Sequence, residues 1–286
     1  MTGSDVLREG RVESRTAWSD ALGEEIDYRV YLPATAPDVR CPSVYLLHGR
    51  RDGDERNDEN DWARVVPLLD ELVRRRVVPP VVAVMPEAPW SGGGSWYVDS
   101  AHTGTPPGRP VETALTRDLV AHVDAIHPTV ADRDHRVVGG FSMGGAGALT
   151  HVLRHPDVFS GALALSPAVY DPLPPADSAT RVFGAFGRGS STFDDDAYAA
   201  SSVSGLLAAY ERAGAPPVRL FLAAGDDHDL DQEATTMHRR AARTAGISSR
   251  LRVLPGGHDW DTWEPAFAEG LPFVLGPTDS ATGSPT

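Results

Sequence analysis

Short apolar runs alternate along the chain with segments whose apolar residues recur at helical spacing. Residues 26–32 alternate apolar and polar side chains, which predicts a half-buried strand. The short apolar runs 43–47 and 81–85 predict buried strands of a parallel sheet, and further strands are predicted over 136–140, 162–165, 218–223 and 249–254. Helices are predicted between them, over 62–76, 111–127, 146–154, 197–213 and 231–245.

This order of elements predicts the fold class. Strands that alternate with helices form a mostly parallel sheet with helices on both faces, so we expect an α/β protein. No internal repeat or interior linker divides the chain. We expect an N-terminal extension over 1–23, one domain over 24–275 and a disordered tail over 276–286. The proline- and glycine-rich loop 86–110 is long enough to predict a functional role.

Composition excludes several kinds of chemistry. The 286 residues carry 40 acidic and 26 basic side chains, a net charge of −14, and no lysine. A Schiff-base lysine, the usual pyridoxal enzymes and a P-loop lysine are therefore excluded. The acidic balance argues against a nucleic-acid partner, because phosphate neutralisation needs a basic surface.

The single cysteine, Cys41, excludes an intramolecular disulfide, zinc ribbons and CxxC redox chemistry. Residues 1–15 contain no apolar signal-peptide core, and no apolar run reaches the length that spans a bilayer. We expect a cytoplasmic protein with no membrane partner, although a processed secreted form would look the same. No cofactor and no metal ligand set is predicted, since the acidic residues lack the spacing of an EF-hand.

Candidate chemistry begins at Gly140-Phe141-Ser142-Met143-Gly144, which fits the G-x-S-x-G nucleophile elbow. An apolar strand precedes it and a helix rich in small residues follows, as the elbow requires. Such a turn presents the serine hydroxyl above a helix N-terminus, where backbone N–H groups favour negative charge. Ser142 is therefore the predicted nucleophile.

A serine hydroxyl needs a base, and the base needs an orienting acid. In this order of elements the histidine comes last, and His258 follows the last predicted strand in a glycine-rich turn. His151 and His155 lie on the helix after the elbow and point away from its tip, so His258 is the predicted base.

The acid is predicted in the loop after strand 218–223, where five carboxylates crowd residues 226–233. Some of them only complement a helix N-terminus. Asp229 is the first choice. Asp226, Asp227 and Glu233 stay open as alternatives.

Several motifs in order resemble the esterase family of α/β-hydrolases. That family includes S-formylglutathione hydrolases, feruloyl esterases, siderophore esterases and mycolyltransferases. The resemblance covers residues 24 to 273 and rests on Tyr31-Leu32-Pro33, Leu46-Leu47-His48-Gly49, Trp96-Tyr97-Val98-Asp99-Ser100, the elbow, and Pro255-Gly256-Gly257-His258-Asp259-Trp260 with Trp263. Together these motifs are specific for the family but not for a substrate.

The resemblance implies an α/β-hydrolase fold, Ser142 as nucleophile and His258 as base. It also implies an oxyanion hole made by the backbone N–H groups of Met143 and Arg50, which would stabilise the tetrahedral intermediate. The position that usually holds the acid is His228 here, a departure from the family pattern. Counting back from Ala245-Gly246 points to Asp229 with one residue inserted, and a mycolyltransferase-like pattern points to Glu233.

A second departure from the family is the charged loop 50–61, which is longer than in relatives. It is either a wall of the acyl site or a solvated surface loop. Trp96 and Tyr97 are predicted to bind substrate, with core packing of their long loop as the alternative.

The sequence therefore predicts a serine esterase that hydrolyses a small-molecule carboxylic ester through an acyl-enzyme on Ser142. An acyltransferase that moves the acyl group to a sugar or other alcohol is the alternative, because both reactions use one triad. A non-catalytic relative is disfavoured by the presence of both Ser142 and His258. Oligomeric state and the natural acyl and alcohol groups are not predicted.

Overall fold

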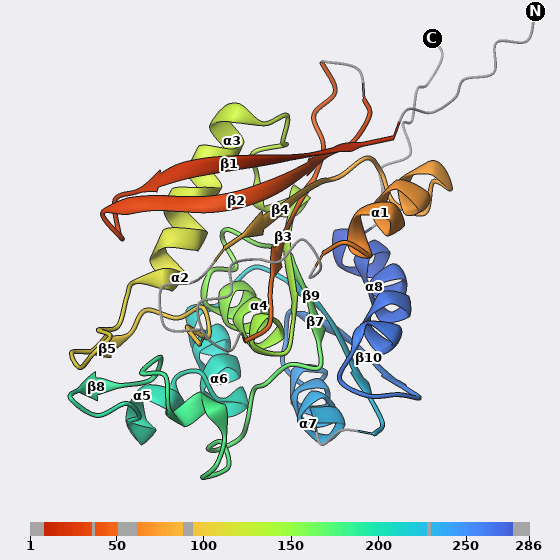
Figure 1. Cartoon of the computed structure of the whole chain (residues 1–286). Coiled ribbons are helices and arrows are strands. Elements are labelled where there is room, and N and C mark those ends of the chain that lie inside the picture. Colours follow the sequence, from red (N-terminus) through yellow and green to blue (C-terminus); the bar gives the residue numbers. More distant parts are fainter. Residues whose placement is uncertain (1–8, 36–37, 51–61, 88–93, 228–229, 277–286) are drawn as a thin grey trace, which may run out of the picture.

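A computed structural model describes residues 9–35, 38–50, 62–87, 94–227 and 230–276. Within these ranges the chain forms an eight-stranded sheet in the order β1-β2-β4-β3-β6-β7-β9-β10. All neighbours from β4 to β10 pair in parallel, while β1 and β2 pair antiparallel to each other and β2 antiparallel to β4. Figure 1 shows this sheet with helices on both sides. The predicted α/β fold is confirmed.

The strand bounds follow the predicted apolar runs closely. The strands are β1 (Arg11–Ser19), β2 (Glu24–Leu32), β3 (Ser43–Leu47), β4 (Val82–Pro86), β6 (Arg136–Phe141), β7 (Gly161–Leu165), β9 (Val218–Gly225) and β10 (Ile247–Leu254). Part of the expected N-terminal extension thus forms β1, an edge strand. Its mostly exposed side chains explain why no apolar run marks it. The expected tail, apart from Gly276, lies outside the described residues.

The helices are α1 (Val65–Arg74), α2 (Val111–Thr113), α3 (Val120–Ile126), α4 (Met143–Arg154), α5 (Asp195–Ala199), α6 (Val203–Ala213), α7 (Leu230–Ala241) and α8 (Trp260–Leu275). A π-helical segment, Ala114–Leu119, joins α2 to α3. The predicted helix over 197–213 is wrong at its middle, because Ser202 caps α6 by accepting from Gly205 N at 3.1 Å. Helix α8 was not predicted from the sequence.

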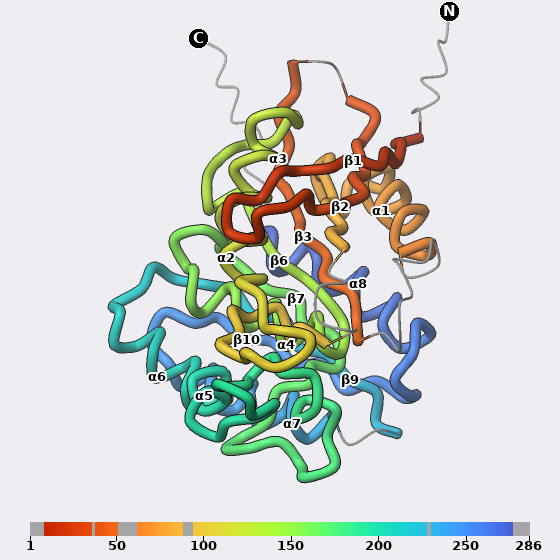
Figure 2. The backbone as a smooth tube through the Cα atoms, turned by 60° about the vertical axis from the view of Figure 1, so that its left-hand side comes forward, coloured from red at the N-terminus to blue at the C-terminus, as the bar shows by residue number. Residues whose placement is uncertain are grey.

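Two cores pack against opposite faces of the sheet because neighbouring strand residues point to opposite sides. In β3, Tyr45 and Leu47 join the core beneath α3, α4, α6 and α7, while Val44 and Leu46 join the core beneath α1 and α8. Figure 2 shows the two helix layers from another side. The short pair β5 (Ala101–His102) and β8 (Arg188–Gly189) joins the long loop to the segment between β7 and α6.

Candidate active site

The predicted site residues follow strands whose carboxyl ends lie at one edge of the sheet. In the register of the parallel strands, Leu47 pairs with Gly140, Phe141 with Leu165, Leu165 with Ala223, and Gly225 with Leu254. These partners are all at or near the ends of their strands. The loops after β3, β6, β9 and β10 therefore emerge together, and this is the edge where open α/β sheets bind ligands.

Ser142 occupies the turn between β6 and α4 in a strained backbone conformation. Its φ is 55° and its ψ −120°, in a region that residues with a side chain rarely adopt. Its N–H donates to the carbonyl of Leu165 at 2.8 Å, which ties the turn to β7. The side chain is partly exposed and stands at the N-terminus of a twelve-residue helix. This is the geometry of a nucleophile elbow.

The glycines around Ser142 are required by close backbone contacts. A Cβ at Gly144 would lie 2.0 Å from the carbonyl oxygen of Leu47, and one at Gly140 would lie 2.5 Å from the backbone of Gly144. Any side chain at either position would push α4 away from the ends of β3 and β6. The glycines of the predicted motif therefore let the helix approach the strand ends.

The loop after β3 runs directly beside the elbow. A Cβ at Gly49 would lie 3.5 Å from the Cβ of Ser142 and 2.6 Å from the ring of Phe141. The two predicted oxyanion donors flank this point, since Arg50 follows Gly49 and Met143 follows Ser142. Arg50 is exposed, and its guanidinium carbon lies 5.7 Å from the centre of the Phe183 ring.

An aromatic cluster connects the elbow to the predicted base. Phe141 stacks on Trp263 with ring centres 4.6 Å apart, and the His258 ring meets Trp263 edge-on at 5.0 Å. Trp263 in turn donates from Nε1 to Ser166 Oγ at 3.0 Å. The Nδ1 atom of His258 is shielded from solvent. One tryptophan thus contacts both the residue before the nucleophile and the predicted base.

Trp263 was expected only as part of the family motif, with no role at the site. Trp62 and Trp260 belong to the same cluster, with ring centres 5.4 Å from Phe141 in both cases. The spacing of Trp260 and Trp263 on one helical face was the available signal. The sequence did not reveal that these tryptophans pack against Phe141, because Phe141 lies far away along the chain.

Asp229, the predicted acid, lies outside the described residues, and so does His228. Of the alternatives, Asp226 accepts a hydrogen bond from Gly256 N at 3.1 Å, and Asp227 donates from its backbone N to Gly256 O at 3.0 Å. Both side chains are exposed. They hold the turn that leads to His258.

Glu233 is the remaining alternative, on α7. Burial raises the pKa of its carboxyl, and the charge of Asp171 raises it further. Asp171 belongs to the segment between β7 and α6, where it pairs with Arg240 at 2.6 Å. The charged group that shifts the pKa of Glu233 is thus another carboxylate, that of Asp171.

Trp96 and Tyr97, the predicted substrate-binding residues, are buried, with 4% and 0% of their surfaces exposed. Trp96 packs against Phe183 and Phe186, each with ring centres 6.4 Å away. The Tyr97 hydroxyl donates to the His48 carbonyl at 3.0 Å. Phe183 is the half-buried member of this group, and it links Trp96 to Arg50. Substrate binding by Trp96 and Tyr97 stays a prediction.

Within the described ranges, no three histidine, cysteine, aspartate or glutamate side chains gather as a metal ion would need. No helix in those ranges is long and apolar enough to cross a membrane.

The parallel sheet and the strained serine at a strand–helix turn define the class: this is an α/β-hydrolase fold. Solved structures support that assignment. A ferulic acid esterase is 28% identical, with a TM-score of 0.73, and the match covers 93% of this chain and 98% of that one. An S-formylglutathione hydrolase from Agrobacterium tumefaciens is 19% identical, with a TM-score of 0.72 over 93% of this chain and 96% of its own.

The particular family follows from the sequence match. The model of the family described as "Putative esterase" matches residues 19–274, nearly the whole described chain, and the protein belongs to this esterase family. It is a carboxylic-ester hydrolase.

Curated relatives carry related names. An acetyl esterase of Caldicellulosiruptor saccharolyticus is 23% identical over 90% of this chain and 95% of its own length. An endo-1,4-beta-xylanase/feruloyl esterase of Xylanibacter ruminicola is 26% identical over 58% of this chain, and this match spans 23% of that larger protein.

Proposed function

We propose that the protein hydrolyses a small carboxylic ester through an acyl-enzyme on Ser142. The observation that carries the proposal is the strained conformation of Ser142, with φ of 55°, beside the backbone of Gly49. Strain of this kind persists only where the surrounding structure holds it, and it concentrates at functional sites. An ordinary buried serine in a glycine turn would not need it.

In the proposed mechanism, His258 takes the proton of Ser142 as the hydroxyl oxygen attacks the ester carbonyl. The shielding of Nδ1 favours Nε2 as the nitrogen that faces Ser142. The backbone N–H groups of Met143 and Arg50 receive the negative charge that develops on the carbonyl oxygen. The intermediate collapses, the C–O bond to the alcohol breaks, and His258 returns its proton to the leaving alkoxide.

Water then takes the place of the alcohol. His258 removes a proton from it as it attacks the acyl-enzyme. The second tetrahedral intermediate then releases the carboxylic acid as His258 returns the proton to Ser142 Oγ. The same acyl-enzyme would react with a sugar or another alcohol if one were bound. Transfer is therefore a measurable outcome of the assay below and not a separate mechanism.

We assign the orienting acid to Asp229. Asp226 is engaged with Gly256, and the environment of Glu233 is dominated by burial and by Asp171. Asn variants at positions 226, 227 and 229 and a Gln variant at 233 separate the four candidates by rate. Asp229→Asn should lower kcat by about 10⁴-fold, as loss of the acid does in a serine triad. A rate within threefold of wild type would overturn this assignment.

The names of the relatives suggest the first substrates. The acetyl esterase and the feruloyl esterases point to acetylated sugars and hydroxycinnamoyl esters as compounds to assay. Products should be analysed with and without added alcohol, so that hydrolysis and transfer are scored in one experiment.

Ser142→Ala is the test of the mechanism. Turnover of p-nitrophenyl acetate should fall by at least about 10⁴-fold, since the nucleophile is lost, and a fluorophosphonate should no longer label the protein. Ser160→Ala is the matched control: it removes a buried serine hydroxyl at the start of β7. Labelling that survives in Ser142→Ala would place the nucleophile elsewhere.

A further inference from the structure

We infer that Tyr97 is a positioning residue for the oxyanion hole. It holds the loop His48-Gly49-Arg50 in place through its contact with His48. The inference rests on the proposed function, because it assigns a task to the N–H of Arg50. Tyr97 touches neither the substrate nor Ser142 in this assignment. It acts through His48.

The first step is the contact between Tyr97 and His48. The Tyr97 hydroxyl donates to the His48 carbonyl at 3.0 Å, and the two rings meet edge-on with centres 5.8 Å apart. Both side chains are buried, at 0% and 3% exposure. In a dry site a hydroxyl–carbonyl bond is costly to break, because the carbonyl then has no water to replace the donor. Tyr97 therefore fixes both the backbone and the ring of His48.

His48 in turn constrains the peptide group that carries the proposed oxyanion donor, the N–H of Arg50. Its Nδ1 lies 2.7 Å from the carbonyl oxygen of Gly49, so Nδ1 carries the proton and donates. That carbonyl and the N–H of Arg50 belong to one planar peptide unit and point in opposite directions. A hydrogen bond that holds the Gly49 carbonyl consequently sets the direction of the Arg50 N–H.

The other end of Tyr97 is anchored on α4, the helix that also carries Met143. The Tyr97 carbonyl accepts from His151 Nε2 at 2.9 Å. Burial lowers the pKa of His151 to about 4, so this histidine is neutral near pH 7 with its proton on Nε2. The Tyr97 ring also lies against Gly147, where an added Cβ would be 2.7 Å from it. Tyr97 thus connects the helix of one proposed donor to the loop of the other.

The backbone of Tyr97 is strained in the same sense as Ser142. Trp96 and Tyr97 have φ values of 45° and 57°, which residues with a side chain rarely adopt. Filling the core does not by itself require this conformation. At this strained residue the hydroxyl contacts His48 and the carbonyl contacts His151 on α4.

Tyr97→Phe tests the inference by removing only the hydroxyl. We expect kcat for p-nitrophenyl acetate to fall about 10- to 100-fold with KM within twofold of wild type, since a donor is misaligned but not lost. Benzyl trifluoromethyl ketone adds to a serine to form an oxyanion, so its inhibition constant should rise by the same factor. Rates are referred to sites titrated with a fluorophosphonate, which counts only folded enzyme.

Tyr28→Phe is the matched control. Tyr28 is equally buried, at 1% exposure, and its hydroxyl lies 3.0 Å from His127 Nε2. It belongs to β2, which β4 and β3 separate from β6 and the elbow. It should lose stability but keep kcat and ketone affinity. If the two variants lose kcat equally, or if Tyr97→Phe loses kcat without losing ketone affinity, the inference is wrong.

Should Tyr97→Phe fail to fold, His151 offers the same test from the other end. His151→Gln keeps an N–H donor for the Tyr97 carbonyl, whereas His151→Leu removes it. The inference requires the leucine variant to lose kcat and ketone affinity together and the glutamine variant to keep both. Equal values in the two variants would overturn it. An inactive wild-type enzyme would instead refute the proposed function.

Discussion

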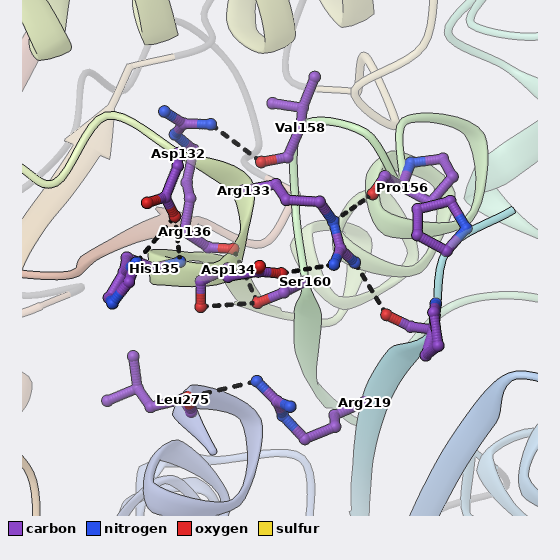
Figure 3. A network of polar contacts seen from close by, with 12 residues as sticks. Asp132, Arg133, Asp134, His135, Arg136, Pro156, Val158, Ser160, Arg219 and Leu275 are labelled. Atoms are coloured by element: carbon purple, nitrogen blue, oxygen red, sulfur yellow. Dashed lines mark hydrogen bonds and ion pairs between the residues drawn. The ribbon is translucent and has the colours of Figure 1, made fainter. Parts of the chain in front are cut away.

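The two ends of the parallel strands are built differently. At the amino end, arginine side chains join loops by hydrogen bonds to backbone carbonyls (Figure 3). Arg133 donates to Pro156 O at 2.7 Å and Pro217 O at 2.8 Å, Arg136 to Val158 O at 2.9 Å, and Arg219 to Val274 O at 2.9 Å.

At the carboxyl end the backbone itself is strained and closely packed. Ser142 and Ser166 have φ values of 55° and 42°, and Gly144 lies against the Leu47 carbonyl. Polar side chains here hold single peptide groups in place, as Tyr97 holds His48.

The difference shows how the fold separates stability from catalysis. Long arginine side chains tolerate small displacements and satisfy carbonyls that would otherwise be buried without a donor. Strained turns tolerate little displacement, but they present backbone N–H groups in one direction. We therefore expect variants at the amino end to change stability and variants at the carboxyl end to change rate.

Gly144→Ala should have the largest effect on rate. Its Cβ would meet the Leu47 carbonyl at 2.0 Å and separate α4 from the oxyanion loop, so kcat should fall about 100- to 1000-fold, as when one oxyanion donor is lost. Gly23→Ala, in the β1–β2 turn, is the control: its Cβ meets no atom within 4 Å, and only its φ of 70° opposes the change. A Gly144→Ala enzyme with kcat within threefold of wild type would contradict the expectation that changes at the carboxyl end of the strands lower the rate.

Arg136→Leu should have the largest effect on stability. The Arg136 side chain is 6% exposed and pairs with Asp124, which is 16% exposed, at 2.5 Å. Without its partner the buried carboxylate should cost about 3–5 kcal/mol of unfolding free energy, measured by urea denaturation. Activity per titrated site should stay within twofold.

The double variant Arg136→Leu/Asp124→Asn sharpens that result. It also removes the unpaired carboxylate charge of Asp124, and it should recover a large part of the lost free energy of unfolding. If Arg136→Leu lost kcat in proportion to its loss of stability, the separation between residues that stabilise the fold and residues that support catalysis would be contradicted.

The smallest expected effect is a change of the free energy of unfolding with pH. Burial lowers the pKa of His151 to about 4 from 6.5, so the unfolded chain binds this proton at a higher pH than the folded chain. The free energy of unfolding should therefore fall as pH drops through that window, by at most about 1.4 kcal/mol for each pH unit from this group. His151→Gln should remove that part of the slope in urea titrations at several pH values. An unchanged slope would mean that folding does not lower the pKa of His151.

Much of the fold was predictable because it depends on local patterns. The run 43–47 became β3 with identical bounds, since a short apolar run of this length is typical of a strand covered on both faces. The elbow was predictable for the same reason: the glycines, the serine and the helix that follows are neighbours in the chain.

The structure decided what depends on distant partners. β1 has little apolar pattern and is held by its pairing with β2, and the helix predicted over 111–127 contains a π-helical segment. Both Trp96 and Tyr97 were predicted as substrate-binding residues from their place in a long loop. Their burial and their contacts with Phe183 and His48 arise only when that loop packs on α4.

The sequence by itself determined most of the alternation of strands and helices, the class of fold and the position of Ser142, because periodicity and turn chemistry act between neighbouring residues. Tertiary structure alone decided that Phe141 and His258 share Trp263, and that Tyr97 contacts His48. The contacts of Phe141 with Trp263 and of Tyr97 with His48 join residues tens of positions apart. They exist because the register of the parallel strands brings their carboxyl ends to one edge, a property of the whole sheet.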